Sequence, residues 1–331
     1  MKYHVYGIGN ALVDKEFEVS DEFLAEHNIE KGMMSLLDEE AHHQLLDKLQ
    51  SNFSLKKRAG GGSAANSIVA ISQLGGSTFY ACKVANDEFG SFYCEDLHAA
   101  GVQTKLDGIN VDGHTGKCMV MVTPDAERTM NTFLGITSDF SEEELHFDEL
   151  KKSEYLYIEG YLVTSDISRA AAIQAKQFAK ENNIKTAMTF SDPSMVTYFK
   201  DGVTEMLGDG VDILFCNEEE CMTFTGKDTL DDAIAELSRQ VRKLVITQGK
   251  NGATVIHGEQ KTNIDPVTAK AIDTNGAGDM FAGAFLYGVT QGLTDQQAGD
   301  LASAAAARIV STFGARLESS DYKELLEQFS A

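Results

Sequence analysis

Residues 273–281 read DTNGAGDMF, and the apolar run behind them, AGAFLYGV (282–289), is typical of a buried helix. The three small residues Gly276, Ala277 and Gly278 then stand where the helix begins. The first N–H groups of a helix have no partner within it, and the helix dipole favours an anion there. We therefore interpret this stretch as an anion hole built from backbone amides.

A turn with a helix cap is the simpler alternative for this stretch. Capping, however, needs only one polar residue among Asp273, Thr274 and Asn275, and it does not need three small residues followed by an aspartate. A carboxylate at Asp279 would repel a bound anion unless it had a chemical task. That task is well met if Asp279 accepts a proton from a substrate hydroxyl while the amides stabilise a transferring phosphoryl group.

The whole chain alternates short β-rich runs with helical runs. This alternation predicts an α/β fold, in which a mostly parallel sheet is covered by helices on both faces. The expected strands are 3–9, 78–85, 154–160, 185–190, 211–215 and 243–249, and the expected helices are 39–50, 63–74, 88–100, 166–181, 276–291 and 295–311.

Two segments, 14–37 and 112–136, break this rhythm with alternating polar and apolar residues. We expect them to form strands outside the main sheet, as a small flap inserted in a single domain that spans 1–331. With 3 prolines among 331 residues and no Ser/Gly-rich linker, nothing indicates a second folding unit.

Composition limits the partners. The net charge of −23 argues against binding of nucleic acid, whose phosphates would be repelled. No apolar run reaches the roughly 18 residues that a membrane span requires. The five cysteines form no zinc-ligand pattern, and their scattered, odd number suits a reducing compartment. We expect a cytoplasmic protein, monomeric or homodimeric, that acts on a small molecule.

The other glycine clusters lack two common nucleotide-binding motifs and leave two loops as candidates for ligand binding. Gly7 and Gly9 follow the first strand, but the dinucleotide fingerprint needs a third glycine where Leu12 stands, and GxxxxGK[ST] is absent. The cluster AGGGSAANSIVAISQLGG (59–76) is either a plain glycine loop before a helix or a ligand loop. TQGKNG (247–252) suits a hairpin, or a loop that wraps phosphates if a nucleotide lies nearby.

Asn217 and Glu220 directly follow the apolar strand VDILF, at the sheet edge where open α/β proteins bind ligands. Asn217 as a helix cap, with acidic residues in the first turn, is a sufficient local explanation. The two residues also share one helix face, from which they could hold Mg²⁺ through its waters.

Taken together, these motifs resemble the PfkB, or ribokinase-like, family of carbohydrate and nucleoside kinases. The stretches that carry the resemblance span the chain, and within the family they are most similar to adenosine kinases: GNALVD (9–14), GGSAANS (61–67), VDILFCNEEE (211–220) and AIDTNGAGDMFAGAF (271–285). The resemblance implies a ribokinase-like three-layer sandwich with a small β lid. It also implies transfer of the γ-phosphoryl group of ATP to a primary hydroxyl, with Mg²⁺.

The resemblance further implies roles for single residues. Asp279 is the expected base, residues 276–278 form the anion hole, and Arg128, in PDAERTM (124–130), is the lid arginine that approaches the transferred phosphate. The substrate would contact Asp14, Gly61, Gly62, Asn66 and Tyr161. ATP would lie along Asn217, Thr247, Gly249, Gly252 and Ser303. Asn217 and Glu220 would organise Mg²⁺, and Asp273 would take part if a monovalent cation such as K⁺ binds near the anion hole.

Adenosine is the first expected substrate, with two alternatives. One is a sugar kinase of the ribokinase, fructokinase or ketodeoxygluconate kinase type on the same scaffold. The other, of a different class, is a nucleotide-binding regulatory protein without catalysis.

Overall fold

A central sheet of eight strands organises the computed structural model, which describes residues 2–108 and 110–329. The strand order is β13-β12-β11-β10-β9-β8-β1-β5. Pairing is parallel from β5 to β11, and β12 and β13 add an antiparallel edge. The strands are β1 (Tyr3–Ile8), β5 (Thr78–Ala81), β8 (Ser153–Ile158), β9 (Lys185–Thr189), β10 (Ile213–Asn217), β11 (Lys243–Thr247), β12 (Ala253–His257) and β13 (Gln260–Ile264).

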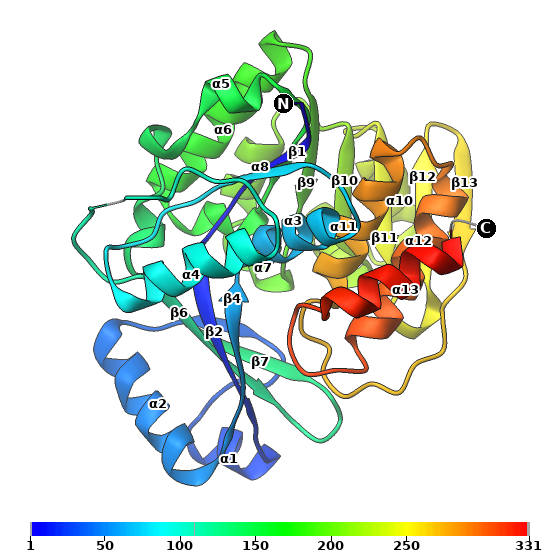
Figure 1. Ribbon diagram of the computed structural model, residues 1–331. Helices are drawn as coiled ribbons and strands as arrows, with labels where there is room; N and C mark the ends of the chain where they lie inside the picture. The colour runs from blue at the N-terminus through cyan, green and yellow to red at the C-terminus, as the bar shows by residue number, and fades with distance from the viewer. Residues whose placement is uncertain (1, 109, 330–331) are drawn as a thin grey trace.

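Helices cover both faces of this sheet and make a three-layer sandwich (Figure 1). One apolar core lies under α3 (Ser63–Gln73), α4 (Glu88–Ala99), α11 (Ala277–Thr290), α12 (Asp295–Ile309) and α13 (Ser319–Phe329). The other lies under α5 (Phe147–Leu150), α6 (Asp166–Glu181), α7 (Pro193–Tyr198), α8 (Lys200–Leu207), α9 (Glu218–Thr225) and α10 (Leu230–Leu237). Short 3-10 turns occur at Gly135–Asp139, Glu142–Glu144, Gly160–Thr164 and Gly249–Asn251. The α/β fold and its mostly parallel sheet are as predicted.

Small side chains bring α3 and α11 unusually close. A Cβ atom at Gly283 would lie 2.6 Å from the carbonyl oxygen of Ser67. The Ser67 hydroxyl in turn donates a hydrogen bond to the backbone carbonyl of Asp279, at 2.9 Å. The glycine therefore sets the spacing between the first turns of the two helices, where the candidate site lies.

A second sheet of five strands, in the order β3-β7-β6-β2-β4, projects from the first (Figure 1). Its strands are β2 (Leu12–Glu18), β3 (Met34–Leu36), β4 (Leu55–Gly61), β6 (Gly116–Val122) and β7 (Arg128–Phe133). Phe17 and Met119 pack against α1 (Asp21–Glu26) and α2 (Glu39–Asn52) in a small separate core. The opposite face of the sheet turns toward the candidate site.

Strands in both interrupted segments, 14–37 and 112–136, were expected, and both contribute to this second sheet. The sequence does not predict strand β4, because the glycines in residues 59–61 indicate a loop before α3, either plain or ligand-binding. Instead, they pair antiparallel with β2, from Leu12 opposite Gly61 to Asp14 opposite Ala59. Glycine is depleted in strands, so its presence concealed an edge strand that local propensity disfavours.

None of the helices described over residues 2–108 and 110–329 is long and apolar enough to cross a bilayer.

Candidate active site

The N-terminus of α11 is capped by backbone geometry alone. Gly276 occupies the cap position with φ 74° and ψ 3°, and no side chain accepts a hydrogen bond there. A Cβ atom at this position would also lie 2.6 Å from the Cα of Ala315, so glycine is required both by the positive φ and by space. By contrast, a Cβ at Gly278 would meet nothing within 4 Å. Of the amides at 276–278, the Ala277 N–H donates a long hydrogen bond of 3.3 Å to the Thr274 carbonyl, and no side chain caps the helix end. The anion hole stays a prediction.

Asp273 holds the loop before Gly276 in place through hydrogen bonds to the backbone. Its carboxylate is fully buried and accepts hydrogen bonds from the backbone N–H of Asn275 at 2.8 Å and of Gly314 at 2.9 Å. These contacts fix the turn before Gly276 and tie it to the segment that carries Ala315. Burial raises the pKa of Asp273, and the two N–H donors oppose that rise.

Asp279 lies in the first turn of α11 and is held by two residues of α3. Ser63 Oγ donates to one carboxylate oxygen at 2.6 Å, and Asn66 Nδ2 donates to the other at 2.9 Å. Desolvation raises the pKa of Asp279 above its ordinary value. The hydrogen bonds from Ser63 and Asn66 lower it, as do the charges of Arg128 and Arg316. The result is a carboxylate in a fixed orientation and more basic than an exposed aspartate.

Arg316 supports this arrangement, and no motif in the sequence indicates its role. It is buried, donates from Nε to Asn66 Oδ1 at 3.0 Å and forms an ion pair with Asp96. Asn66 is therefore oriented from both sides, with its oxygen toward Arg316 and its nitrogen toward Asp279. The charge of Arg316 also opposes the desolvation that raises the pKa of Asp14 to about 7.

A cavity of about 770 Å³, including its part open to solvent, lies between the two sheets and ends at Asp279. Its polar lining includes Ser63 and Asn66, which hold Asp279. Its apolar lining comes largely from the second sheet, including Met34, Leu36 and Met130. Of the predicted substrate residues, the cavity is lined by Asp14, Gly62, Asn66 and Tyr161.

A second cavity lies on the other side of the anion-hole loop, between the β11–β12 turn and α12. The two cavities share three lining residues, Thr274, Ala277 and Gly278. Of the predicted ATP residues, the second cavity is lined by Thr247, Gly249, Gly252 and Ser303. A ligand in each cavity would therefore meet the other at the N-terminus of α11, next to Asp279.

The hairpin that joins β6 to β7 contacts the anion-hole loop, which precedes α11. Its residue Ala126 has φ 67°, an uncommon value for a residue other than glycine. In this conformation the Ala126 carbonyl accepts hydrogen bonds from the backbone N–H of Thr274 at 3.2 Å and from its Oγ1 at 3.0 Å. The second sheet is thus anchored to the anion-hole loop, and Arg128, two residues beyond, is brought into the first cavity.

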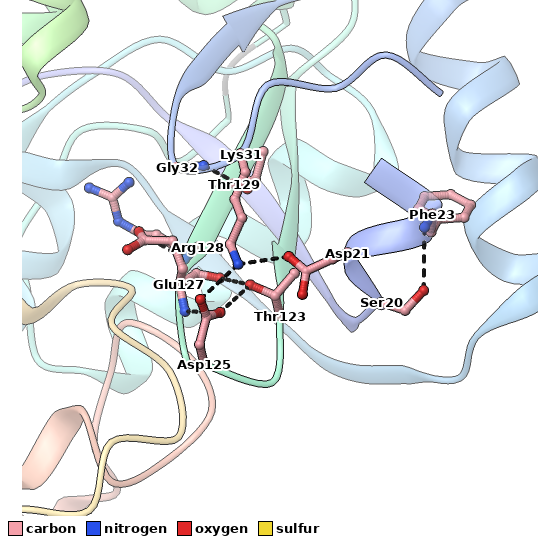
Figure 2. A network of polar contacts seen from close by, with 10 residues as sticks. All are labelled: Ser20, Asp21, Phe23, Lys31, Gly32, Thr123, Asp125, Glu127, Arg128 and Thr129. Carbon is pink, nitrogen blue, oxygen red and sulfur yellow. Dashed lines mark hydrogen bonds and ion pairs between the residues drawn. The ribbon is translucent and has the colours of Figure 1, made fainter. Parts of the chain in front are cut away.

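A polar network holds the hairpin in shape (Figure 2). Lys31 Nζ lies 2.7 Å from carboxylate oxygens of both Asp21 and Asp125, and Asp125 also accepts from Thr123 Oγ1 at 2.7 Å. The Arg128 guanidinium points away from this network (Figure 2) and lies 3.7 Å from Asp192 Oδ2. Because this separation exceeds a good hydrogen bond, Arg128 is only loosely held at Asp192.

A family model described as pfkB family carbohydrate kinase matches residues 34–321. The chain belongs to the pfkB family. It is accordingly a phosphotransferase that acts on a hydroxyl group.

Similar proteins point mainly to adenosine kinases. The adenosine kinase of Saccharomyces cerevisiae is 31% identical over 304 residues, which cover 86% of this chain and 88% of that protein. The structure of adenosine kinase from Sinorhizobium meliloti superposes with a TM-score of 0.94 at 31% identity, covering 99% and 100% of the two chains. A probable sugar kinase from Rhizobium etli gives the same TM-score at 30% identity, with 100% and 99% covered. The ribokinase-like fold is thereby confirmed.

In this pfkB kinase, Asn217 and Glu220 form a reciprocal helix cap. Asn217 Oδ1 accepts from the backbone N–H of Glu220 at 2.8 Å, and the Glu220 carboxylate accepts from the Asn217 N–H at 2.9 Å. Burial raises the pKa of Glu220 to about 8, while the N–H of Asn217 and the charge of Arg128 oppose the rise. Neither residue lines the two cavities.

Gly61 also lies outside the lining of the substrate cavity, although it was predicted to contact substrate. Its position serves Asp14: a Cβ atom at Gly61 would lie 2.2 Å from the Asp14 carboxylate. The Gly61 carbonyl meanwhile accepts a hydrogen bond from the hydroxyl of Tyr93 at 2.9 Å. The structure thus gives Gly61 a steric role, making room for a neighbouring side chain.

Glu159 is a site residue that sequence reasoning missed. It follows β8 directly, is fully buried, and accepts from the backbone N–H of Asn10 at 3.1 Å and of Ala64 at 2.8 Å. Desolvation raises its pKa to about 8, and these N–H donors oppose the rise. Its position at the carboxyl end of a parallel strand, like that of Asn217, is the signal that could have found it.

The buried carboxyl group of Glu16 makes the free energy of unfolding depend on pH. It is buried on β2, and its Oε2 has no hydrogen-bond partner among the described residues. Burial, then the charges of Asp273 and Asp14, raise its pKa to about 8. A raised pKa means that the folded state holds a proton that the unfolded state releases. The resulting stabilisation is present below the unfolded pKa and disappears as the pH rises through 8.

We therefore predict that the free energy of unfolding of the ligand-free protein falls as the pH rises from roughly 5 to 8. Glu16→Gln, which cannot ionise, should flatten this fall by up to about 1 kcal/mol per pH unit. Urea unfolding at several pH values measures both slopes. Glu18→Gln, an exposed residue of the same strand, is the control and should keep the wild-type slope. Identical slopes in wild type and Glu16→Gln would contradict the assignment.

Proposed function

We propose that this kinase transfers the γ-phosphoryl group of ATP to the primary hydroxyl of a nucleoside, with adenosine as the first candidate. The observation that supports it most is the meeting of two cavities at the N-terminus of α11, with Asp279 at the junction. The nucleoside would occupy the cavity between the sheets, and ATP the cavity beside α12.

Asp279 is proposed as the general base. Its two hydrogen bonds from α3 hold the carboxylate in one orientation, and its raised pKa makes it a better proton acceptor than an exposed aspartate. The carboxylate would accept the proton of the primary hydroxyl as the oxygen becomes nucleophilic. Asn66 and Ser63 would keep it ionised and aimed during this step.

The anion hole and Arg128 are proposed to stabilise negative charge. ATP, when bound, supplies the phosphoryl group. The amides at 276–278 would face the charge that develops on its oxygens, in a position set beforehand by Gly276 and Asp273. Arg128 would leave its loose contact with Asp192 and add a positive charge from the opposite side.

For Mg²⁺, the donor set fits in part. Glu220 and Asn217 offer the oxygen atoms that Mg²⁺ prefers, but each is already used in the reciprocal cap. We therefore propose that they act on Mg²⁺ through its bound waters. Asp273 also uses both of its oxygens on backbone N–H groups, so its part in any K⁺ site would be to supply negative charge.

The second sheet is proposed to act as a lid over the substrate. It carries Asp14, a candidate for the sugar hydroxyls, and the apolar Met34, Leu36 and Met130, which suit a flat base. Such an apolar wall favours a nucleoside over a free sugar, because a sugar would leave it uncovered. Exclusion of water by a closed lid would also protect the phosphoryl group from hydrolysis.

A sugar kinase is the second candidate, favoured by the likeness to the Rhizobium etli protein. We predict that adenosine has the highest kcat/KM in a panel of adenosine, other nucleosides, ribose, fructose and ketodeoxygluconate, followed by ADP release.

Met130→Ser should lower kcat/KM for adenosine by about 10-fold or more, since it removes apolar contact worth roughly 1–3 kcal/mol, and should affect sugars little. Leu55→Ser, exposed on β4, is the control. Preference for a sugar would overturn the nucleoside assignment, and no ADP release with any acceptor would revive a purely regulatory role.

Replacement of the base tests the catalytic role separately. Asp279→Asn keeps the size of the side chain and should lower kcat by about 10²–10⁴-fold while ATP still binds. Steady-state kinetics and calorimetric titration with ATP measure the two effects. Asp47→Asn, on the exposed face of α2, serves as the matched control. Near-normal turnover by Asp279→Asn would eliminate the proposed base.

A further inference from the structure

A cluster of three metal-ligating side chains lies away from both cavities, at the end of α4. Cys94 and His98 stand one helical turn apart, and Asp107 faces them from the segment that follows the helix. Cys94 Sγ lies 3.9 Å from His98 Nδ1 and 3.8 Å from Asp107 Oδ1, and His98 Nε2 lies 3.8 Å from Asp107 Oδ2. The third distance joins other atoms of His98 and Asp107 than the first two. With one ligand atom taken from each residue, the three ligand atoms all lie within 4.8 Å of one another.

The two distances from Cys94 Sγ are close to those between ligands of a tetrahedral metal site. With metal–sulfur bonds of about 2.3 Å and metal–nitrogen bonds of about 2.0–2.1 Å, tetrahedral angles place sulfur and nitrogen roughly 3.6 Å apart. The observed spacing exceeds this value by only a few tenths of an ångström. Sulfur–oxygen spacing follows the same arithmetic. The contacts are also too long for strong hydrogen bonds, so hydrogen bonding is a weak explanation of the cluster.

We propose that Cys94, His98 and Asp107 bind a divalent transition-metal ion of the Zn²⁺ type, with water in the fourth position. The mixed thiolate, imidazole and carboxylate set suits Zn²⁺ and Co²⁺, whereas Mg²⁺ and Ca²⁺ prefer oxygen alone. Binding replaces the S–H bond of Cys94 by a sulfur–metal bond, and the released proton passes to solvent. No electron is transferred.

Exposure singles out Cys94 among the five cysteines. The other four are buried, whereas Cys94 is partly accessible, so a metal ion from solvent can reach its thiol. His98 and Asp107 are more exposed still, with 41% and 76% of their side chains accessible. The ligands can therefore adjust by the small distance that closure around an ion requires.

A metal ion bound here would tether the segment between α4 and β6 to α4 itself. That connection is already fastened at its far end, where Asp87 accepts hydrogen bonds from the N–H and Oγ1 of Thr115. A short bridge between Phe79 and Gln103 fastens it near the start. Asp107 lies between these two points, and a bond from it to α4 through the metal would fasten the middle. The site is structural, since none of its residues lines either cavity.

Titration of the full-length protein with Co²⁺ in place of Zn²⁺ tests this proposal by absorbance. A thiolate–Co²⁺ charge-transfer band should appear and saturate at one ion per chain, and competing Zn²⁺ should abolish it. Cys94→Ser should lose the band, and His98→Asn or Asp107→Asn should weaken binding by at least about 10-fold. His114→Gln, another exposed histidine beside a glutamate, is the matched control and should bind as wild type.

The readout is independent of turnover. Co²⁺ that replaced Mg²⁺ at Asn217 and Glu220 would give no thiolate band, because neither residue carries sulfur. Failure of the metal proposal and failure of the kinase assignment are therefore distinguishable. A thiolate band that persists in Cys94→Ser, or no band at millimolar Co²⁺ in reduced protein, would overturn the site.

Discussion

The structure depends above all on one interaction: the carboxylate of Asp279 held beside the open N-terminus of α11. A helix terminus attracts an anion, and a neighbouring carboxylate weakens that attraction unless its charge is controlled. Here Ser63 and Asn66 bind the carboxylate from α3, and Arg316 holds Asn66 in turn. The close packing of α3 on α11 at Gly283 makes these contacts possible.

The second sheet also contacts the loop that precedes α11. The Ala126 carbonyl accepts both hydrogen bonds from Thr274, a residue that borders both cavities. The hairpin that carries Arg128 is thus joined to the loop that forms the anion hole. In the proposed function, closure over the substrate and assembly of the catalytic groups are the same event.

Much of this could be predicted from the sequence, where local pattern and chemistry agreed. Strand–helix alternation indicated the six parallel strands of the main sheet but not its antiparallel edge, β12 and β13. The glycines before α11 indicated the geometry now seen at Gly276. Contacts between residues distant in the chain were invisible. Arg316 stands 250 positions from Asn66, and nothing in its neighbourhood indicates that contact. The edge strand β4 was missed for the opposite reason, because its glycines locally disfavour a strand that pairing with β2 nevertheless stabilises.

The pH dependence of kcat/KM for adenosine in wild type and Ser63→Ala tests the central claim most directly. Activity should fall toward acid pH with a midpoint above the ordinary aspartate pKa, because the base proposed at Asp279 has to be ionised to accept a proton. Removal of the Ser63 hydrogen bond destabilises the ionised form, so the midpoint should move to higher pH in Ser63→Ala. A midpoint that stays in place would contradict the account, since the carboxylate held by Ser63 would not then be the group that controls turnover.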